Sequence, residues 1–546
     1  MVGDALMDIV QKIKNMLWKG AAVVGATNSL SRIVDDSRIS MSAAEYDRIV
    51  KDFKYYANRY DKVSYIDAEN VRRYRPFNSV NLTKRAAQRI ASIVFNEQCE
   101  ISFDNDEVGE YLNDVLSAND FKNQFEMNLE KGVVAGGFAM RPYVGTDGTI
   151  KIAWVRADQF FPLQSNTNSI SEAAISSRTV VSEHDRNVYY TLLEFHEWKD
   201  NKYVVTNELY RSETADIVGN QVPLATLYPD MEPQAIFDAG GMIKPLFSYF
   251  RMPGANNISL ESPLGIGIVD NSKTALDNLN LTHDSFMWEI RNGKRKIAVP
   301  EELMKFDKHT HRPMFDTDTD VYVKMIGDDI SIQDMTNDIR VQQFTDSMNA
   351  WLREFEANIG MAPGTFSYDP HNGMQTATAV VSENSMTYQT RSSILTNVTA
   401  AIEQLCVSIL ELSMASKLFP NGESPFTLPN DFDLNDIGIH VKYDDGVTVD
   451  KDKQMEEDLK NVVAGVLSKT TFLQRNYGLS EDDAREELAR IQAEQPDADT
   501  IGGQQTTELG GGDGDWLLKR TCLIRQIRLL TFTASYSNRL YSGLSI

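Results

Sequence analysis

The residues in this sequence that could do chemistry fall in incomplete patterns. His196 and Glu197 begin an HExxH-like run, but the second histidine is missing and the run lies in a predicted strand, so no zinc site is expected. Gly265 and Gly267 are followed by Asp270 where a dinucleotide fingerprint needs its third glycine. Walker A, GxSxG and SxxK patterns are absent from the sequence. We therefore expect no catalytic residues and no cofactor.

Acidic residues and histidines between 305 and 325 could be read as a metal site. Asp316, Asp318 and Asp320 have the spacing of the start of a calcium loop, but a valine and a glycine stand where that loop needs its glycine and its glutamate. Alternate residues of a strand point to one side, so an acidic strand face is the preferred interpretation. His309 and His311 have no third ligand at useful spacing, which favours surface histidines. No metal is expected.

Composition excludes some functions and allows others. The 546 residues are 42% hydrophobic, enough for real cores and for two to four domains. With 78 acidic against 54 basic residues the net charge is -24, which argues against a broad basic face that grips nucleic acid. Cys99, Cys406 and Cys522 are far apart and odd in number, which favours a reducing cytosol over a disulfide framework.

The sequence contains no run of 18 apolar residues, so no segment is predicted to span a membrane. Residues 1–20 carry charges inside their apolar part, which is not typical of a signal peptide. One face of this segment is apolar and is expected to dock on the protein itself or on a neighbouring copy, with a membrane surface as the alternative. The apolar face consists of Leu6, Ile9, Val10, Ile13 and Leu17.

The period of the apolar residues changes along the chain, and the predicted secondary structure changes with it. The expected fold class is α+β and mainly helical. The predicted elements are helices over 42–131, antiparallel hairpins over 136–211, a helix over 262–291, a small β module over 297–334, a helix over 338–358, a long helix over 376–418 and a charged helical region over 450–495. A Gly-rich linker and a basic tail from Trp516 to Ile546 follow.

Two features of this order stand out. The stretch GMAPGTFSYDPHNGMQ, residues 360–375, joins two strongly helical patterns, and no lysine or arginine occurs between Ala357 and Thr390. Arg291, Lys294, Arg295 and Lys296 form a basic cluster at the end of the helix over 262–291. Positive charge at a helix C-terminus is favourable by itself, and a contact with phosphates or an acidic neighbour is the alternative.

The order of helix, small β module, returning helix, flexible loop, long helix and charged helical end resembles the portal proteins of long-tailed bacteriophages of Gram-positive hosts. The resemblance spans roughly residues 40–495. It is carried by SPLGIGIVDNSKTALDNLNLTHDSFMWEIRNGKRKIAVP, GMQTATAVVSENSMTYQTRSSI and GVLSKTTFLQRNYGLSEDDAREELARI. Two stretches depart from the family: Ala379 stands where relatives often have glutamate, and the basic tail from Trp516 has no counterpart. We interpret that tail as out-of-frame translation, with a disordered segment or a DNA contact as alternatives.

The resemblance implies a subunit made of wing, stem, clip and crown that assembles into a closed ring, usually of twelve copies. The implied parts are an N-terminal wing over 1–260, a first stem helix over 261–296, a clip over 297–336, a second stem helix over 337–359, a tunnel loop over 360–375, a long wing helix with a following strand over 376–449, a crown over 450–500, and the linker and tail over 501–546.

The resemblance also implies a function without enzymatic activity. The ring would stand at one capsid vertex of the virion, after synthesis in the host cytoplasm, as the channel for packaging and ejecting double-stranded DNA. The implied partners are other copies of the chain, viral DNA, the terminase large subunit, head-tail connector proteins, and the major capsid and scaffolding proteins, with no membrane. The loop residues expected to face DNA are Met361, Thr365, Tyr368, His371, Asn372 and Gln375. An acidic intracellular hydrolase and an oligomeric scaffold unrelated to DNA are the alternative hypotheses.

Overall fold

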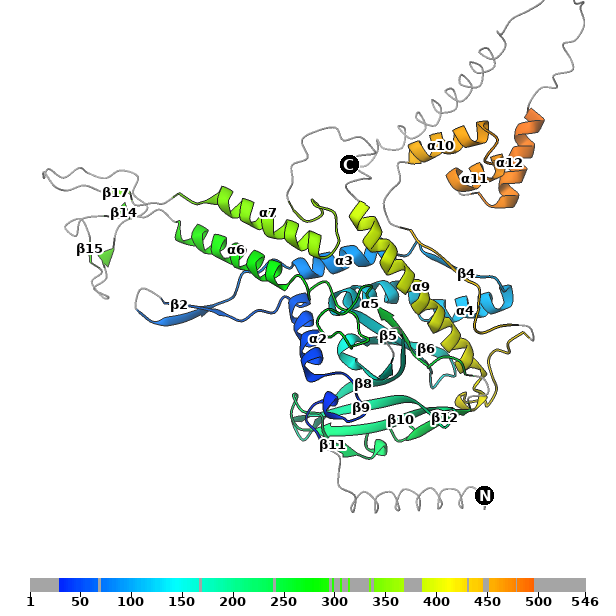
Figure 1. The fold of residues 1–546 in the computed structure, drawn as a ribbon, viewed down its shortest axis with the longest axis horizontal. Helices are drawn as coiled ribbons and strands as arrows, with labels where there is room; N and C mark the ends of the chain where they lie inside the picture. The colour runs from blue at the N-terminus through cyan, green and yellow to red at the C-terminus, as the bar shows by residue number, and fades with distance from the viewer. Residues whose placement is uncertain are drawn as a thin grey trace, which may run out of the picture. The chain divides into compact units, whose positions relative to one another are not determined.

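The structure is a computed structural model. It describes residues 29–66, 70–165, 169–238, 242–293, 338–367, 385–429, 432–444, 451–477 and 479–494, and four short strands between 297 and 334 (Figure 1). The chain divides into two compact units, residues 1–447 and residues 448–546.

The N-terminal part of the first unit is largely helical, as predicted. Ser42 caps the first described helix by accepting the Glu45 N–H at 3.2 Å, and Asn105 caps a later one by accepting the Val108 N–H at 3.0 Å. The sequence pattern missed three short strands in this region. The elements are α2 (Ala43–Tyr56), β2 (Val63–Ile66), β3 (Arg72–Arg75), α3 (Leu82–Val94), β4 (Glu100–Phe103), α4 (Asp106–Ala118) and α5 (Phe121–Ala135).

Both predicted hairpins are confirmed. Strands β5 (Gly137–Val144) and β6 (Ile150–Arg156) pair antiparallel, and β13 (Ser248–Arg251) joins β5 on its other edge. Strands β9 (Arg186–Lys199) and β10 (Lys202–Ser212) pair around a two-residue turn. Both turn residues have positive φ, 48° for Asp200 and 59° for Asn201, as the tight turns of hairpins require.

A larger antiparallel sheet surrounds the second hairpin, in the order β1-β11-β10-β9-β8-β7. The sequence pattern did not predict the strands that flank β9 and β10 in this sheet. One edge of β10 serves two partners, because its first half pairs with β12 and its second half with β11. These strands are β1 (Ser29–Leu30), β7 (Phe160–Ser165), β8 (Ile170–Glu183), β11 (Gly219–Val222) and β12 (Gln234–Asp238). The short 3-10 helices of this unit are η1 (Ile33–Asp35), η2 (Ala157–Gln159), η3 (Leu224–Thr226) and η5 (Ser416–Leu418).

The long helix α9 (Ser385–Met414) packs across β13 and β5 (Figure 1). Its inward polar side chains bind the backbone of residues 245–251: Asn397 donates to the Arg251 carbonyl at 2.9 Å and Gln404 donates to the Phe247 carbonyl at 2.9 Å. Among the described helices it alone is long and apolar enough to cross a membrane, yet 56% of its most apolar window is buried in the protein. We therefore treat α9 as a core helix.

Two helices extend from the first unit, α6 (Lys273–Asn292) and α7 (Val341–Asn358), and we call them the helix pair (Figure 1). The segment between them contains two described strand pairs: β14 (Ile297–Ala298) with β17 (Gln333–Asp334), and β15 (Lys305–Phe306) with β16 (Pro313–Met314). This agrees with the predicted small β module. The predicted acidic strand face at 316–320 and the histidines at 309 and 311 lie outside the described residues.

After α9, strand β18 (Ile439–Lys442) returns to pair with β4. The second unit contains α10 (Lys451–Val463), α11 (Lys469–Tyr477) and α12 (Glu481–Glu494), as the charged helical pattern predicted. Asn476 of α11 donates to the Asp458 carboxylate of α10 at 3.0 Å. Ser480 caps α12 by accepting the Asp483 N–H at 3.1 Å.

Candidate functional site: the roots of the helix pair

The two members of the helix pair run antiparallel. Phe286 of α6 and Phe344 of α7 lie with ring centroids 5.1 Å apart. Arg340, at the start of α7, donates to the Glu289 carboxylate from its backbone N–H at 2.9 Å and from its guanidinium at 2.6 Å. These hydrogen bonds from Arg340 hold the pKa of Glu289 below its ordinary value. The contacts join the end of α6 to the start of α7, so the β module between them is carried by both helices.

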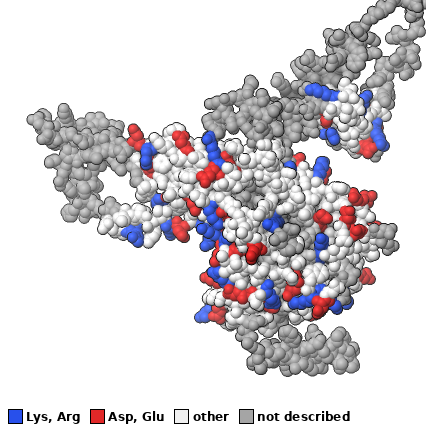
Figure 2. All heavy atoms as spheres, viewed as in Figure 1, with Lys and Arg blue, Asp and Glu red and all other residues white. Residues whose placement is uncertain are grey.

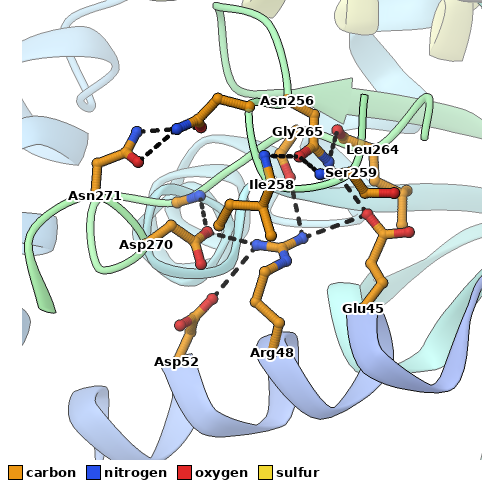
Figure 3. Close-up of polar contacts among 12 residues, drawn as sticks. Glu45, Arg48, Asp52, Asn256, Ile258, Ser259, Leu264, Gly265, Asp270 and Asn271 are labelled. Atoms are coloured by element: carbon orange, nitrogen blue, oxygen red, sulfur yellow. Dashed lines mark hydrogen bonds and ion pairs between the residues drawn. The ribbon is translucent and has the colours of Figure 1, made fainter. Parts of the chain in front are cut away.

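The root of α6 is held by a buried network of charges around Arg48 (Figure 3). Arg48 contacts the Asp270 carboxylate at 2.5 Å, the Asp52 carboxylate at 3.5 Å and the Gly265 carbonyl at 3.3 Å. Lys273 adds a second cation, 3.3 Å from Asp52 and 3.4 Å from Asp270. The network links α2 to the segment immediately before α6.

Burial makes this network sensitive to loss of any member. The side chains of Asp52 and Asp270 are 0% exposed and that of Arg48 is 6% exposed. Burial raises the pKa of Asp52, and the charge of Asp270 raises it further, while Lys273 and Arg48 lower it. Removing one partner from a buried ion pair leaves an uncompensated charge, which costs about 3–5 kcal/mol.

The predicted start of this helix at Ser262 and Pro263 is wrong, because α6 begins at Lys273. The intervening segment packs directly against the backbone at the end of α5. A Cβ on Gly267 would lie 1.7 Å from the Val134 carbonyl oxygen, and a Cβ on Gly265 would lie 2.2 Å from the Gly136 carbonyl oxygen. These glycines therefore serve a close backbone approach.

One face of α6 carries polar side chains that bind the surrounding body. Asp277 accepts the Tyr55 hydroxyl at 2.8 Å, and Asn280 accepts the Val80 N–H at 2.8 Å. Further along, Asp284 binds Arg75 through both of its oxygens, at 2.6 and 2.7 Å. The hydrogen bond from Arg75 holds the pKa of Asp284 below its ordinary value. Spaced three and four residues apart, these groups fix both the position and the rotation of the helix.

The root of α7 is built on one buried carboxylate. The Glu356 side chain is buried, with 0% exposure, and accepts the N–H groups of Phe366 and Ser367 at 2.5 and 2.8 Å on one oxygen. Its other oxygen accepts the Gly364 N–H at 3.1 Å and the Ser367 hydroxyl at 3.0 Å. Four hydrogen bonds therefore hold residues 361–367 against the last turn of the helix. We call residues 361–367 the anchored segment.

The start of α9 holds the same segment from the other side. Thr387 accepts the Ala362 N–H at 2.9 Å, and Thr390 donates to the Gly360 carbonyl at 2.7 Å. Gly360 has a φ of 70°, and a Cβ there would lie 2.3 Å from the Thr390 hydroxyl. Glycine is thus required by both conformation and space. The first half of the loop that the sequence predicted as flexible is fixed at both of its neighbouring helices.

The loop residues predicted to face DNA lie in different settings in the structure. Met361 is 1% exposed and belongs to the main core, so it is removed from the set that could face DNA. Thr365 donates to the Ala362 carbonyl at 2.6 Å. The other predicted loop residues lie outside the described part of the chain: Tyr368, His371, Asn372 and Gln375.

The basic cluster is described at one position only. The Arg291 guanidinium lies 5.6 Å from the ring centroid of Trp288. Lys294, Arg295 and Lys296 lie outside the described residues. A contact of this cluster with phosphates therefore stays a prediction.

Sequence reasoning missed Glu356, Arg48 and Asp270. A signal was present for Glu356, because it lies four residues after Leu352 and next to Phe355 on the apolar side of the predicted helix. A carboxylate in such a place must have buried partners. Arg48 and Asp270 carry no comparable signal, since their partners are more than two hundred residues apart in sequence.

The described groups with strongly shifted pKa values serve the fold. His196 is buried, its Nδ1 lies 2.9 Å from the Tyr203 hydroxyl, and burial lowers its pKa to about 3. His196 lies within strand β9, whereas the HExxH zinc motif needs a helix. In the described ranges no group of three or more histidine, cysteine, aspartate or glutamate side chains could hold a metal ion.

Surface charge is mixed on the face shown in Figure 2. Lysine and arginine side chains alternate there with aspartate and glutamate side chains over the described residues. Such a face has no extended basic area for nucleic acid. With a body, a rigidly rooted helix pair and a β module carried between the helices, the chain belongs to the class of structural assembly proteins.

The family comparison gives that class a name. The chain matches the model of the family described as "Phage portal protein, SPP1 Gp6-like" over residues 36–500. It therefore belongs to this family of phage portal proteins, which is structural and not enzymatic.

The chain is also similar to solved structures. One is a chain of the "Neck of empty GTA particle computed with C6 symmetry", with 12% identity and a TM-score of 0.39 over 73% of this chain and 89% of that chain. Another is a chain of the "Neck of native GTA particle computed with C12 symmetry", with 11% identity and a TM-score of 0.37 over 72% of this chain and 87% of that chain. No curated protein sequence matches the chain.

Proposed function

We propose that this portal protein forms a closed ring, usually of twelve copies in the family, through which double-stranded DNA is packaged into a capsid and later ejected. The observation that carries the proposal is the family match over residues 36–500. Its setting is one vertex of the capsid in a long-tailed phage of a Gram-positive host, with synthesis in the host cytoplasm.

The parts of the subunit are assigned by its resemblance to portal proteins. Helices α6 and α7 are proposed as the stem, and residues 297–336 as the clip that meets the terminase large subunit during packaging and the connector proteins afterwards. Residues 1–260 and 376–449 form the wing, which faces the major capsid and scaffolding proteins. Residues 450–500 form the crown. A stem held at its root by buried ion pairs can transmit force between clip and wing without bending at the junction.

Residues 360–375 are proposed as the tunnel loop. The anchored segment gives the loop a fixed base, since Glu356, Thr387 and Thr390 hold it at both sides. The part that contacts DNA is then assigned to Tyr368, His371, Asn372 and Gln375, with Thr365 at its edge. Each lysine or arginine on a phosphate adds salt-dependent affinity, which would slow DNA in a channel. The absence of both residue types between 357 and 390 suits a loop that lets DNA slide.

An enzymatic function is the competing proposal. A hydrolase would need an accessible acid and base with shifted pKa values. Glu411 has a raised pKa, but its carboxylate is buried and accepts the Lys244 N–H at 3.2 Å. Asp52, the other described carboxylate with a strongly raised pKa, is 0% exposed within the Arg48 network. Both groups hold the fold together, which favours the structural function.

Electron microscopy of the purified full chain tests the ring directly. Closed rings with an axial opening wide enough for duplex DNA are expected. A chain that stays monomeric at high concentration would refute the proposal. A variant that lacks residues 368–375 tests the loop. Its rings should form normally, and DNA packaging in a reconstituted system should fall. Loss of the rings in this variant would make the loop an assembly element.

A further inference from the structure

The hairpin of β2 and β3 has one face on α6 and one face in solvent. On the inner face, the Tyr65 ring lies 5.3 Å from the Trp288 ring, and the Arg75 guanidinium lies 4.7 Å from the same ring while it binds Asp284. The cross-strand register places Tyr65 opposite Arg73 and Val63 opposite Arg75 on this side. The hairpin is thereby fixed along one side of α6.

The other face of the hairpin is uncovered. The register places Ile66 opposite Arg72 and Ser64 opposite Tyr74 on this side. Ile66 is 66% exposed and Tyr74 is 64% exposed, and Arg72 is exposed beside them. Tyrosine and arginine are enriched at the centre of protein interfaces, and the exposed isoleucine adds apolar area beside them. An isolated two-stranded hairpin is also marginally stable, so covering this face would stabilise it.

Helix α6 lies between this hairpin and α7 (Figure 1). Its contacts with the hairpin come from Asp284 and Trp288, whereas Phe286 meets α7. Residues two apart on an α-helix point about 200° away from each other. Hairpin, α6 and α7 therefore follow one another in a row across the subunit.

The far side of α7 offers a matching surface. Gln342, Asp346, Ala350 and Glu354 are all exposed and lie four residues apart, so they form one stripe along the helix. Ala350 has the shortest side chain of the stripe, and the carboxylates of Asp346 and Glu354 lie one turn before and one turn after it. Phe344 meets α6, and Asp346 and Ala350 follow it by two and six residues. At 100° per residue they point about 160° and 120° away from Phe344, so this part of the stripe faces away from the hairpin of its own chain.

We propose that the outer face of the hairpin of one copy docks on the α7 stripe of a second copy. This rests on the proposed ring, because a closed ring joins two unlike surfaces of each subunit, and the row ends in the hairpin on one side and in the stripe on the other. Arg72 lies against the carboxylate of Asp346, and Ile66 and Tyr74 cover Ala350. A DNA contact would leave the two apolar side chains of this face unused.

A disulfide tests the docking in the full chain. Cys99 and Cys406 are buried, and Cys522→Ser removes the remaining thiol. On that background Tyr74→Cys is combined with Ala350→Cys. Within one subunit the two positions are separated by α6, whose diameter of about 10 Å exceeds the reach of a disulfide. Mild oxidation of assembled rings is expected to give a ladder of cross-linked multimers on a non-reducing gel.

The controls separate this proposal from the ring itself. Each single cysteine variant, and Tyr74→Cys combined with Glu107→Cys on α4, should give no ladder. Rings that form in the microscope without a ladder from the Tyr74 and Ala350 pair would overturn the docking and leave the ring intact. A chain that forms no rings would refute both.

A charge reversal gives an independent measurement. Arg72→Glu should raise the protein concentration needed for half-maximal ring formation by about fivefold, as for one exposed ion pair, and Asp346→Lys in the same chain should restore part of it. The matched control is Lys51→Glu, an exposed residue of α2. Unchanged assembly of Arg72→Glu together with weaker retention of double-stranded DNA would overturn the docking in favour of a phosphate contact.

Discussion

Replacing Glu356 by glutamine is expected to loosen the base of the tunnel loop. The carboxylate accepts four hydrogen bonds, from the N–H groups of Gly364, Phe366 and Ser367 and from the Ser367 hydroxyl. Glutamine has nearly the same shape, but one of its two terminal groups is an amide NH₂, which donates. Two of the four donors would then face another donor.

The magnitude follows from the number of bonds lost. A hydrogen bond to a charged group contributes about 1.5–3 kcal/mol. Loss of two such bonds at a fully buried site lowers the free energy of local opening by at least about 3 kcal/mol. Each 1.4 kcal/mol corresponds to about a factor of ten, so amide exchange in the anchored segment should become about 100-fold faster.

Hydrogen exchange measured by mass spectrometry on a peptide covering residues 361–367 provides the assay. Gln343→Glu is the matched control, because Gln343 lies on the same helix outside the α7 stripe and is exposed. That variant should change exchange by less than about twofold, as for an ordinary surface substitution. Exchange in Glu356→Gln within threefold of the unmodified chain would refute the assignment of Glu356 as the anchor.

Three further predictions concern the body of the subunit. Arg48→Met should lower the free energy of unfolding by about 3–5 kcal/mol, because it removes one of the two cations that face the buried carboxylates of Asp52 and Asp270 and leaves only Lys273 beside them. Lys51→Met on the same helix should change it by less than about 0.5 kcal/mol, and thermal unfolding of the full chain measures both. Glu411→Gln should flatten the dependence of stability on pH between about 4.5 and 7, measured as melting temperature against pH. Gly267→Ala should prevent soluble folding, since its Cβ would meet a backbone carbonyl oxygen at 1.7 Å. Gly109→Ala on α4, whose Cβ would meet no backbone and no atom closer than the Phe103 Cβ at 3.3 Å, should leave the chain soluble in an expression assay.

The sign of the pH effect at Glu411 follows from its surroundings. Burial raises the pKa of this carboxyl from 4.5 to about 7, against the backbone N–H groups of Ile243 and Lys244, which lower it. Between these values the folded chain holds a proton that the unfolded chain has released, so the free energy of unfolding falls as pH rises. The full effect across that window is about 3 kcal/mol. A melting temperature of Glu411→Gln that fell as steeply as that of the unmodified chain would contradict the assignment.

Two results would contradict the predictions for Arg48→Met and Gly267→Ala. Equal melting temperatures for Arg48→Met and Lys51→Met would show that the Arg48 network does not hold the root of α6. Soluble, folded Gly267→Ala would show that the segment before α6 can move away from α5.

Sequence patterns predicted the elements that carry a strong local signal. Helix α7 has apolar residues three and four apart, and the hairpin of β9 and β10 is marked by the turn at Asp200 and Asn201; both were found in place. Strand β8 was missed, although it is 14 residues long, because its second half is largely uncovered and carries polar residues on both faces. Strand β12 was missed because only pairing with β10 defines it.

The contacts at the roots of the helix pair could not be predicted from sequence patterns. The start of α6 was predicted ten residues too early, since Ser262 and Pro263 form a good local start signal and nothing local shows that Gly267 packs on Val134. The partners of Arg48 lie 222 residues away at Asp270 and 217 away at Gly265. Such contacts depend on tertiary folding, which composition and spacing do not encode.

The most direct test of the central claim is the oligomeric state of the full chain, measured by native mass spectrometry together with electron microscopy. A portal subunit is expected to give one closed ring species with an axial opening that admits duplex DNA. A protein that stays monomeric at all concentrations, or that forms open filaments without an axial opening, would contradict the account.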